Sequence, residues 1–133
     1  KTWKDVNDAW PDKQISIYAP GIASGTHDYF VEVIGKKDGK GLRADEQTML
    51  SEDDKALVTG VKGDKFAIGF FGFSYYDANK DELKAVSIVN PISTKSVAPS
   101  MASIESGEYA PFSRPVYLRQ LGVLPTSRSQ RIR

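Results

Sequence analysis

The sequence predicts a single α/β domain, because segments with strand character alternate with segments with helix character along most of the chain. A length of 133 residues suits one compact domain and leaves no room for two. The most hydrophobic segment, residues 65–72 (Lys-Phe-Ala-Ile-Gly-Phe-Phe-Gly), has the length and bounding glycines of a strand buried on both faces.

A helix is predicted at residues 2–10. Trp3, Val6 and Trp10 recur at helical spacing, and Pro11 ends the pattern. We expect Trp3 and Trp10 to anchor this helix to the core.

The next three segments predict a strand, a loop and a helix. Residues 14–18 alternate polar and apolar side chains, which is typical of a strand. Residues 19–24 contain Pro20 and Gly21 and predict a loop. In residues 26–34, apolar pairs lie four positions apart, so one face of a helix is apolar.

Another helix is predicted to begin near Ser51. It follows a polar connection at residues 35–41 and a stretch at 42–50 that fits neither pattern. The Ser-x-x-Asp spacing from Ser51 to Asp54, with acids in the first turn, is typical of a helix start. We expect this helix to end within residues 60–64, which contain two glycines.

The α/β alternation continues after the hydrophobic strand. We expect Tyr75 and Tyr76 to pack a helix against the sheet. The predicted elements are a helix at 73–83, a strand at 84–89, a short helix at 99–106 closed by Gly107, and a strand at 114–118.

The domain is therefore expected to span residues 1–118, followed by an irregular or mobile tail at 119–133. The last stretch of this tail, residues 125–133, carries three Arg, no acid and one large apolar residue. So few apolar side chains predict little packing.

Composition excludes several kinds of site. The chain has no Cys, which excludes disulfides, thiolate zinc sites and cysteine nucleophiles. Lys and Arg number 18 and Asp and Glu 17, so the net charge is +1. This balance excludes a strong attraction of the whole molecule to nucleic acid or anionic membrane, so any anion site must be local.

The clearest chemical signal is Ser24-Gly25-Thr26, between the predicted strand at 14–18 and the helix at 26–34. Backbone N–H groups in the first turn of a helix lack helical partners, and the helix dipole adds positive charge there. Two hydroxyls beside a glycine let a small oxyanion approach these donors. A Ser before a helix is more often a simple N-cap, but a strand-to-helix turn lies at the sheet edge where α/β proteins bind ligands.

Several further motifs follow this turn in a specific order. The chain resembles the second domain of periplasmic phosphate-binding proteins, the substrate-binding subunits of phosphate ABC transporters, over roughly residues 2–118. The segments that carry this resemblance are Ile17-Tyr18 through Ser24-Gly25-Thr26-His27-Asp28-Tyr29-Phe30, Arg43 with Asp45, Ser51-Glu52-Asp53-Asp54, Gly60-Val61, Ala67-Ile68-Gly69-Phe70-Phe71-Gly72, Tyr75-Tyr76 and Asn79, Leu83-Lys84-Ala85-Val86, Gly107-Glu108-Tyr109-Ala110-Pro111 and Ser113-Arg114-Pro115.

The resemblance implies one lobe of a type II periplasmic binding protein, with a central mixed sheet and helices on both faces. In that family two α/β domains enclose phosphate and close by hinge motion. The expected function is phosphate binding for uptake by an ABC transporter, with this chain contributing half of an inter-domain site. The resemblance implies neither a catalysed reaction nor a cofactor.

The resemblance also implies the site residues. Ser24, Gly25 and Thr26 are expected to donate hydrogen bonds to phosphate, and Arg43 is expected to hold two of its oxygens with the guanidinium fork. Asp45 is expected to orient Arg43 through an ion pair. Because the other domain supplies the remaining donors, we expect the isolated chain to bind phosphate weakly or not at all.

The partners implied by the resemblance are inorganic phosphate, the missing first domain of the same protein and the membrane permease of an ABC transporter. No nucleic-acid partner is expected. The isolated lobe could also self-associate, because it exposes its cleft face. The implied location is periplasmic or extracellular, with the signal peptide outside this sequence.

Three alternatives compete with this interpretation. Ser24 and His27 could form the nucleophile and base of a hydrolase. Because the two residues are three positions apart within one helical turn, their side chains have a poor geometry for nucleophilic attack. We therefore expect a capped helix with an exposed His27. The chain could instead be a non-catalytic adhesion or scaffold lobe. The acidic run from Glu52 to Asp54 could bind a cation, but the helix dipole explains it, so we expect no metal site.

Overall fold

The computed structural model describes residues 1–34, 43, 45–90, 93–109 and 115–120. Its elements in chain order are β1 (Ser16–Pro20), α1 (Gly25–Ile34), β2 (Thr48–Ser51), α2 (Asp54–Gly63), β3 (Ala67–Gly72), α3 (Phe73–Asp77), β4 (Leu83–Ala85), β5 (Ile88–Val89), β6 (Ser96–Val97), α4 (Met101–Glu105) and β7 (Pro115–Gln120).

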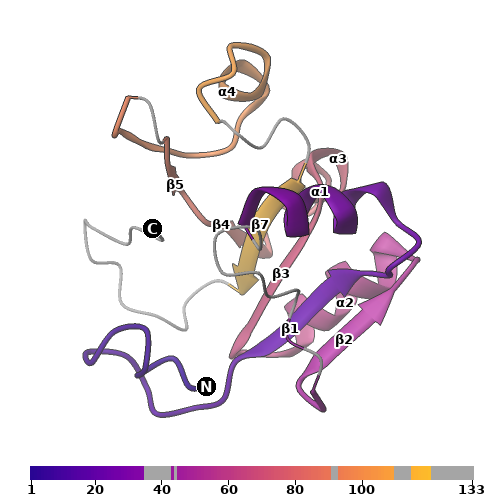
Figure 1. Ribbon diagram of the computed structural model, residues 1–133, viewed down its shortest axis with the longest axis vertical. Helices are drawn as coiled ribbons and strands as arrows, with labels where there is room; N and C mark the ends of the chain where they lie inside the picture. The colour runs from indigo at the N-terminus through magenta and orange to yellow at the C-terminus, as the bar shows by residue number, and fades with distance from the viewer. Residues whose placement is uncertain (35–42, 44, 91–92, 110–114, 121–133) are drawn as a thin grey trace.

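A five-stranded mixed sheet forms the centre of the fold, in the order β2-β1-β3-β7-β4 (Figure 1). Strand β1 runs parallel to β2 and β3, whereas β7 is antiparallel to β3 and β4. The mixed sheet confirms the predicted fold class. Because Pro20 lies opposite Ser51, the carboxyl ends of β1 and β2 meet at one edge, and α1 and α2 both start beyond that edge.

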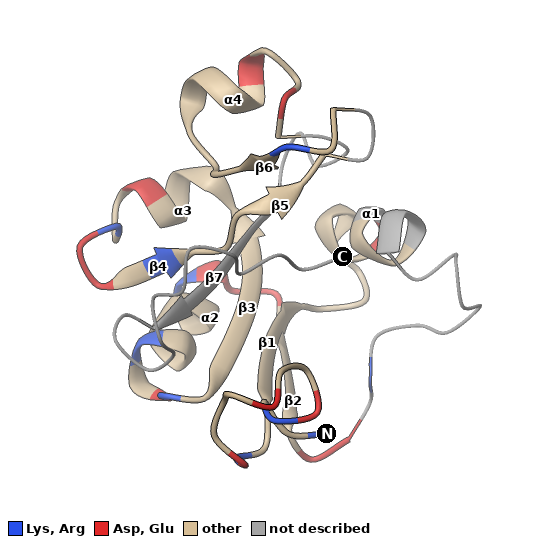
Figure 2. Ribbon diagram, turned by 90° about the vertical axis from the view of Figure 1, so that its left-hand side faces the viewer, with Lys and Arg blue, Asp and Glu red and all other residues tan. Residues whose placement is uncertain are grey.

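Helices cover both faces of this sheet, as predicted (Figure 2). On one face Phe30 of α1 stacks on Phe70 of β3, with ring centroids 4.1 Å apart. On the other face Leu57 and Val61 of α2 pack with Phe71. Successive residues of a strand point to opposite faces, so Phe70 and Phe71 serve one layer each. This division explains why the strand is apolar throughout.

Helix α2 lies close against the sheet at Gly60. A β-carbon on Gly60 would overlap the ring of Tyr18 on β1. Gly60 therefore serves close helix–sheet packing and does not end the helix, which continues to Gly63.

The start of α2 also differs in detail from the prediction. Asp53, and not Ser51, is the N-cap, because its carboxylate accepts a hydrogen bond from the Lys55 N–H at 2.9 Å. The hydroxyl of Ser51 instead accepts a hydrogen bond from the Asp53 N–H.

The predicted helix at residues 2–10 is wrong. This segment is a series of turns that begins with a bridge between Thr2 and Gln14. Local bonds compete with helix formation, since the Asp5 carboxylate accepts from the Thr2 N–H and the Asn7 side chain accepts from the Ala9 N–H.

The two tryptophans anchor this series of turns, and not a helix, to the domain. Trp3 is 5% exposed, and its indole N–H donates to the Phe66 carbonyl oxygen at 2.9 Å. Trp10 packs edge-on against Trp3, with ring centroids 5.7 Å apart. Val6, the third residue of the helical pattern, is exposed.

The segment after β3 is divided more finely than predicted. Helix α3 ends at Asp77, after which Asn79 donates its side-chain amide to the Tyr75 carbonyl oxygen. The single strand expected at 84–89 is two strands, because β4 pairs with β7 in the main sheet and β5 pairs with β6 in a second one. Tyr75 and Tyr76 pack with the α2 cluster, as expected.

The second sheet and α4 extend from one end of the domain (Figure 1). Tyr109, which is 1% exposed, packs in one cluster with Ile88 of β5 and Phe70 of β3. Its hydroxyl donates to the Val86 carbonyl oxygen at 3.4 Å. These contacts connect the small sheet to the main core.

The last described strand, β7, extends to Gln120. Arg119 and Gln120, which we placed in the tail, pair with β3 and β4. The rest of the expected tail, and the expected connection at 35–41, lie outside the described residues. Within the described ranges, no helix is both long enough and apolar enough to cross a membrane.

Candidate functional site

Backbone hydrogen bonds hold the Ser24-Gly25-Thr26 turn at the carboxyl end of β1. The Gly21 N–H donates to the Ser51 carbonyl oxygen at 3.0 Å, which joins the loops that follow β1 and β2. The Ser24 N–H then donates to the Gly21 carbonyl oxygen at 2.9 Å, and α1 begins at Gly25. The turn therefore lies at the sheet edge that the sequence predicts.

Ser24 caps the helix. Its hydroxyl oxygen accepts a hydrogen bond from the Thr26 N–H at 3.2 Å, and its carbonyl oxygen accepts one from the Asp28 N–H at 3.3 Å. The capping interpretation is therefore confirmed. It does not exclude an anion, because a hydroxyl that accepts one hydrogen bond still has a hydrogen to donate.

The backbone beside this cap is open to solvent. Gly25 is exposed, and a β-carbon on it would meet no atom within 4 Å. In the described part of the chain, no acceptor meets the N–H groups of Gly25 and His27. Two donors and the positive end of the α1 dipole thus face a region that a small anion can enter.

His27 is more buried than we expected. Its side chain is 13% exposed, and Nδ1 lies 3.6 Å from a carboxylate oxygen of Asp28. Nδ1 is buried and has no hydrogen-bond partner among the described residues. No hydrogen bond joins His27 to Ser24 in this part of the structure, and the Ser24 hydroxyl is engaged at Thr26. The geometry therefore lacks the nucleophile–base contact that a hydrolase needs.

Arg43 does not lie beside the turn. Its Nη2 donates to the Ile15 carbonyl oxygen at 2.6 Å, just before β1 begins. The turn follows the other end of β1, and the five steps along the strand from Ile15 to Pro20 span about 16 Å at 3.3 Å per residue. The structure thus separates Arg43 from Ser24, Gly25 and Thr26.

The ion pair expected between Arg43 and Asp45 is present. The Nε of Arg43 lies 2.6 Å from a carboxylate oxygen of Asp45, and the arginine side chain is 26% exposed. Asp45 also accepts hydrogen bonds from the Gln47 N–H and the Thr48 hydroxyl. The carboxylate therefore orients the guanidinium, in this structure toward Ile15.

The acidic run at the start of α2 fits a capped helix. Asp53 is the N-cap, and burial first and the Asp53 carboxylate second raise the pKa of Asp54 above its ordinary value. No group of three or more His, Asp or Glu side chains with the geometry to hold a metal ion occurs among the described residues.

Glu52 is a neighbour of the site that the sequence alone did not reveal. A β-carbon on Gly21 would overlap the Glu52 carboxylate, so that side chain lies directly over the loop that holds Ser24. The only available signal was a glycine in a loop, which does not identify the residue that approaches it.

Comparison with known proteins supplies the family. A family model described as a PBP superfamily domain matches residues 1–119. The chain belongs to the PBP superfamily. This membership and the observed mixed sheet confirm the fold predicted from the resemblance.

Relatives of this PBP superfamily chain include proteins named SphX and a phosphate-binding protein named PstS. Over 116 residues it is 47% identical to protein SphX of Synechococcus elongatus, covering 87% of this chain and 33% of the relative. Over 118 residues it is 39% identical to the phosphate-binding protein PstS of Staphylococcus haemolyticus, covering 89% of this chain and 35% of the relative. The chain thus spans about a third of these relatives.

A solved structure has the same fold as this PBP superfamily chain. It is described as a possible phosphate binding protein from Planctomyces limnophilus, with a TM-score of 0.76 and 42% sequence identity. The match covers 88% of this chain and 40% of that chain.

Proposed function

We propose that this chain is one lobe of a phosphate receptor and that the Ser24-Gly25-Thr26 turn forms its half of the phosphate site. The observation that carries the proposal is the exposed start of α1, where N–H groups without an acceptor among the described residues adjoin Gly25, and a β-carbon on Gly25 would meet none of the described atoms within 4 Å. The phosphate-binding names of the relatives support the choice of anion.

The chemistry at this turn suits a tetrahedral oxyanion. The N–H groups of Gly25 and His27 and the hydroxyls of Ser24 and Thr26 are donors, and the helix dipole favours negative charge beside them. Each donor meets a different oxygen only if the anion comes close to the backbone, which the missing side chain of Gly25 permits. No covalent step is part of this function.

Arg43 joins the proposed site only through a change of partner. Its guanidinium would exchange the Ile15 carbonyl oxygen for phosphate oxygens, and the ion pair with Asp45 would keep it oriented. A guanidinium is suited to this role, because it can donate two parallel hydrogen bonds to one anion.

The remainder of the receptor lies outside this chain. Because the chain spans about a third of its relatives, we propose that a second domain covers the phosphate and that the closed protein delivers it to a membrane permease. Such delivery places the protein in the periplasm or outside the cell. With half of the donors, the chain alone is expected to bind phosphate only in the millimolar range.

The test is a pair of glycine substitutions in the chain. Gly25→Ala puts a methyl group at the proposed site, whereas Gly63→Ala puts the same group at the end of α2, where a β-carbon also meets nothing within 4 Å. Helical Gly→Ala changes are neutral or stabilising by up to about 1 kcal/mol, so both variants should fold.

Phosphate is titrated while backbone amide shifts are followed by heteronuclear NMR. We expect amides 24–27 to shift in the unmodified chain and in Gly63→Ala, with at least fivefold weaker binding in Gly25→Ala. Phosphate-induced shifts that occur elsewhere in the chain but not at residues 24–27, or equal affinities in the two variants, would overturn the proposal. Repeating the titration with Arg43→Met tests the change of partner separately. Loss of the guanidinium should weaken phosphate binding only if Arg43 leaves the Ile15 carbonyl oxygen for the phosphate.

A further inference from the structure

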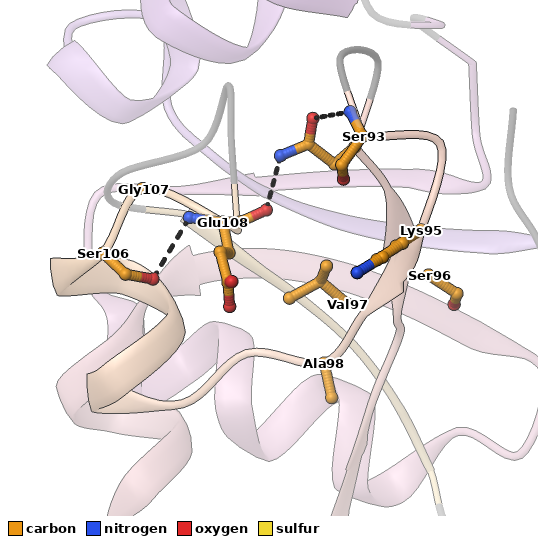
Figure 3. A pocket seen from close by; sticks show the side chains of 9 residues that line it. Ser93, Lys95, Ser96, Val97, Ala98, Ser106, Gly107 and Glu108 are labelled. Atoms are coloured by element: carbon orange, nitrogen blue, oxygen red, sulfur yellow. Dashed lines mark hydrogen bonds between the residues drawn. The ribbon is translucent and has the colours of Figure 1, made fainter.

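A pocket lies away from the turn, between the β5–β6 hairpin and the end of α4 (Figure 3). Its volume is about 570 Å³, which is large enough for a small organic molecule. Among the described residues, its lining includes none from β1, α1 or the proposed phosphate site. They are Asn90, Ser93, Lys95, Ser96, Val97, Ala98, Ser106, Gly107 and Glu108.

Opposite charges line this pocket without meeting. Lys95 comes from the hairpin and Glu108 from the segment after α4, and in Figure 3 their side chains lie on either side of Val97. Neither side chain forms an ion pair within the described residues, so their charged atoms are more than 4 Å apart. The pocket therefore offers one cationic and one anionic group, separated by an apolar surface.

The backbone takes an unusual conformation immediately before each charged residue. Thr94 has φ of 57° and Gly107 has φ of 73°, and no other described residue has a positive φ. Gly107 ends α4, where a left-handed glycine is common. Thr94 lies in the turn between β5 and β6, where its N–H donates to the Asn90 carbonyl oxygen at 2.8 Å, and hairpin turns often contain a left-handed residue. Both positive φ values thus belong to the turns that precede Lys95 and Glu108 in the pocket lining.

One buried side chain ties the two walls together. Asn90 is 7% exposed, and its side-chain amide donates to the Glu108 carbonyl oxygen at 2.8 Å. Its side-chain oxygen accepts from the Ser93 N–H at 3.1 Å, and its backbone N–H donates to the Lys95 carbonyl oxygen at 2.9 Å. These bonds fix the spacing of the two backbone segments from which the exposed Lys95 and Glu108 side chains extend.

We propose that this pocket binds a small zwitterion, an amino acid whose amine and carboxylate are separated by a short apolar chain. The carboxylate would pair with Lys95, the ammonium with Glu108, and the chain between them would lie on Val97. A simple anion is disfavoured by Glu108 and a simple cation by Lys95. In an α-amino acid the two charges are adjacent, so it could pair with Lys95 or with Glu108 but not with both at once.

The experiment titrates the chain with γ-aminobutyrate and ε-aminocaproate and follows backbone amide shifts by heteronuclear NMR. We expect saturable shifts at residues 93–98 and 106–108. Butyrate and butylammonium, each with one charge, should bind about threefold to fivefold more weakly, because each forms one exposed ion pair.

Three variants complete the test. Lys95→Met and Glu108→Gln should each weaken binding of the zwitterion by a similar factor, whereas Glu105→Gln, at the last residue of α4 and outside the pocket lining, should leave it unchanged. The proposal is overturned if the zwitterion does not shift the amides of residues 93–98 and 106–108, or if the single-charge compounds bind equally well. It is also overturned if Glu105→Gln weakens zwitterion binding as much as Glu108→Gln does. Stronger shifts with inorganic phosphate would also overturn it, since the pocket would then be an anion site.

Discussion

Ser24 combines two roles that substitution can separate. Its hydroxyl caps α1 by accepting the Thr26 N–H at 3.2 Å, and in the proposed function it also donates to phosphate. Alanine removes both roles. Aspartate retains the cap, because Asp and Ser are similarly good N-caps, but it places a negative charge where the anion should bind.

The expected magnitudes differ for stability and for binding. Loss of the cap in Ser24→Ala should lower the free energy of unfolding by about 1 kcal/mol, whereas Ser24→Asp should leave it nearly unchanged. An anion on the α1 amides would lie about 5 Å from the new carboxylate, where two unit charges repel by about 0.8 kcal/mol in water and about 3 kcal/mol at an effective dielectric constant near 20. This range corresponds to a loss of phosphate affinity between about fourfold and 200-fold.

The assay combines urea unfolding with the phosphate titration by NMR. A matched control is Ser100→Asp, which puts the same charge at the N-cap of α4, where Ser100 accepts from the Ser103 N–H at 3.0 Å. We expect phosphate affinity to fall in both Ser24 variants and to be unchanged in Ser100→Asp. If Ser24→Asp is as stable as the unmodified chain and binds phosphate equally well, the reasoning about this turn is refuted.

Two further predictions concern stability. Gly60→Ala forces a methyl group into the ring of Tyr18, so the free energy of unfolding should fall by about 1–3 kcal/mol, whereas Gly63→Ala should show no loss; equal melting temperatures for the two variants would contradict the packing seen at Gly60. Burial and Asp53 raise the pKa of Asp54 above 3.8, so ionisation of this carboxyl group disfavours the folded state. The contribution of Asp54 to the free energy of unfolding should therefore fall as pH rises from 3.8 through the folded-state pKa. Urea unfolding across this interval should therefore show Asp54→Asn gaining stability relative to the unmodified chain, and a difference independent of pH would contradict the assignment.

The amino-acid pattern alone predicted the elements that depend on strong local signals. The apolar run that became β3 and the paired apolar positions of α1 were identified because burial on two faces and burial on one face leave different periodicities. The Ser24-Gly25-Thr26 turn was also predicted from local features, namely a cap residue and a glycine at the boundary between a strand and a helix. The order of motifs along the chain then indicated the family.

Tertiary structure decided the features that depend on a distant partner. Trp3, Val6 and Trp10 have helical spacing, yet side-chain bonds to the backbone and contacts with Phe66 gave a series of turns. Arg43 has five donors and a long side chain, so its partner depends on the nearest acceptors in space, here Asp45 and the Ile15 carbonyl oxygen. Local periodicity is set by neighbours in sequence, whereas the end point of a long charged side chain and the facing walls of a pocket are set by segments that meet only after folding.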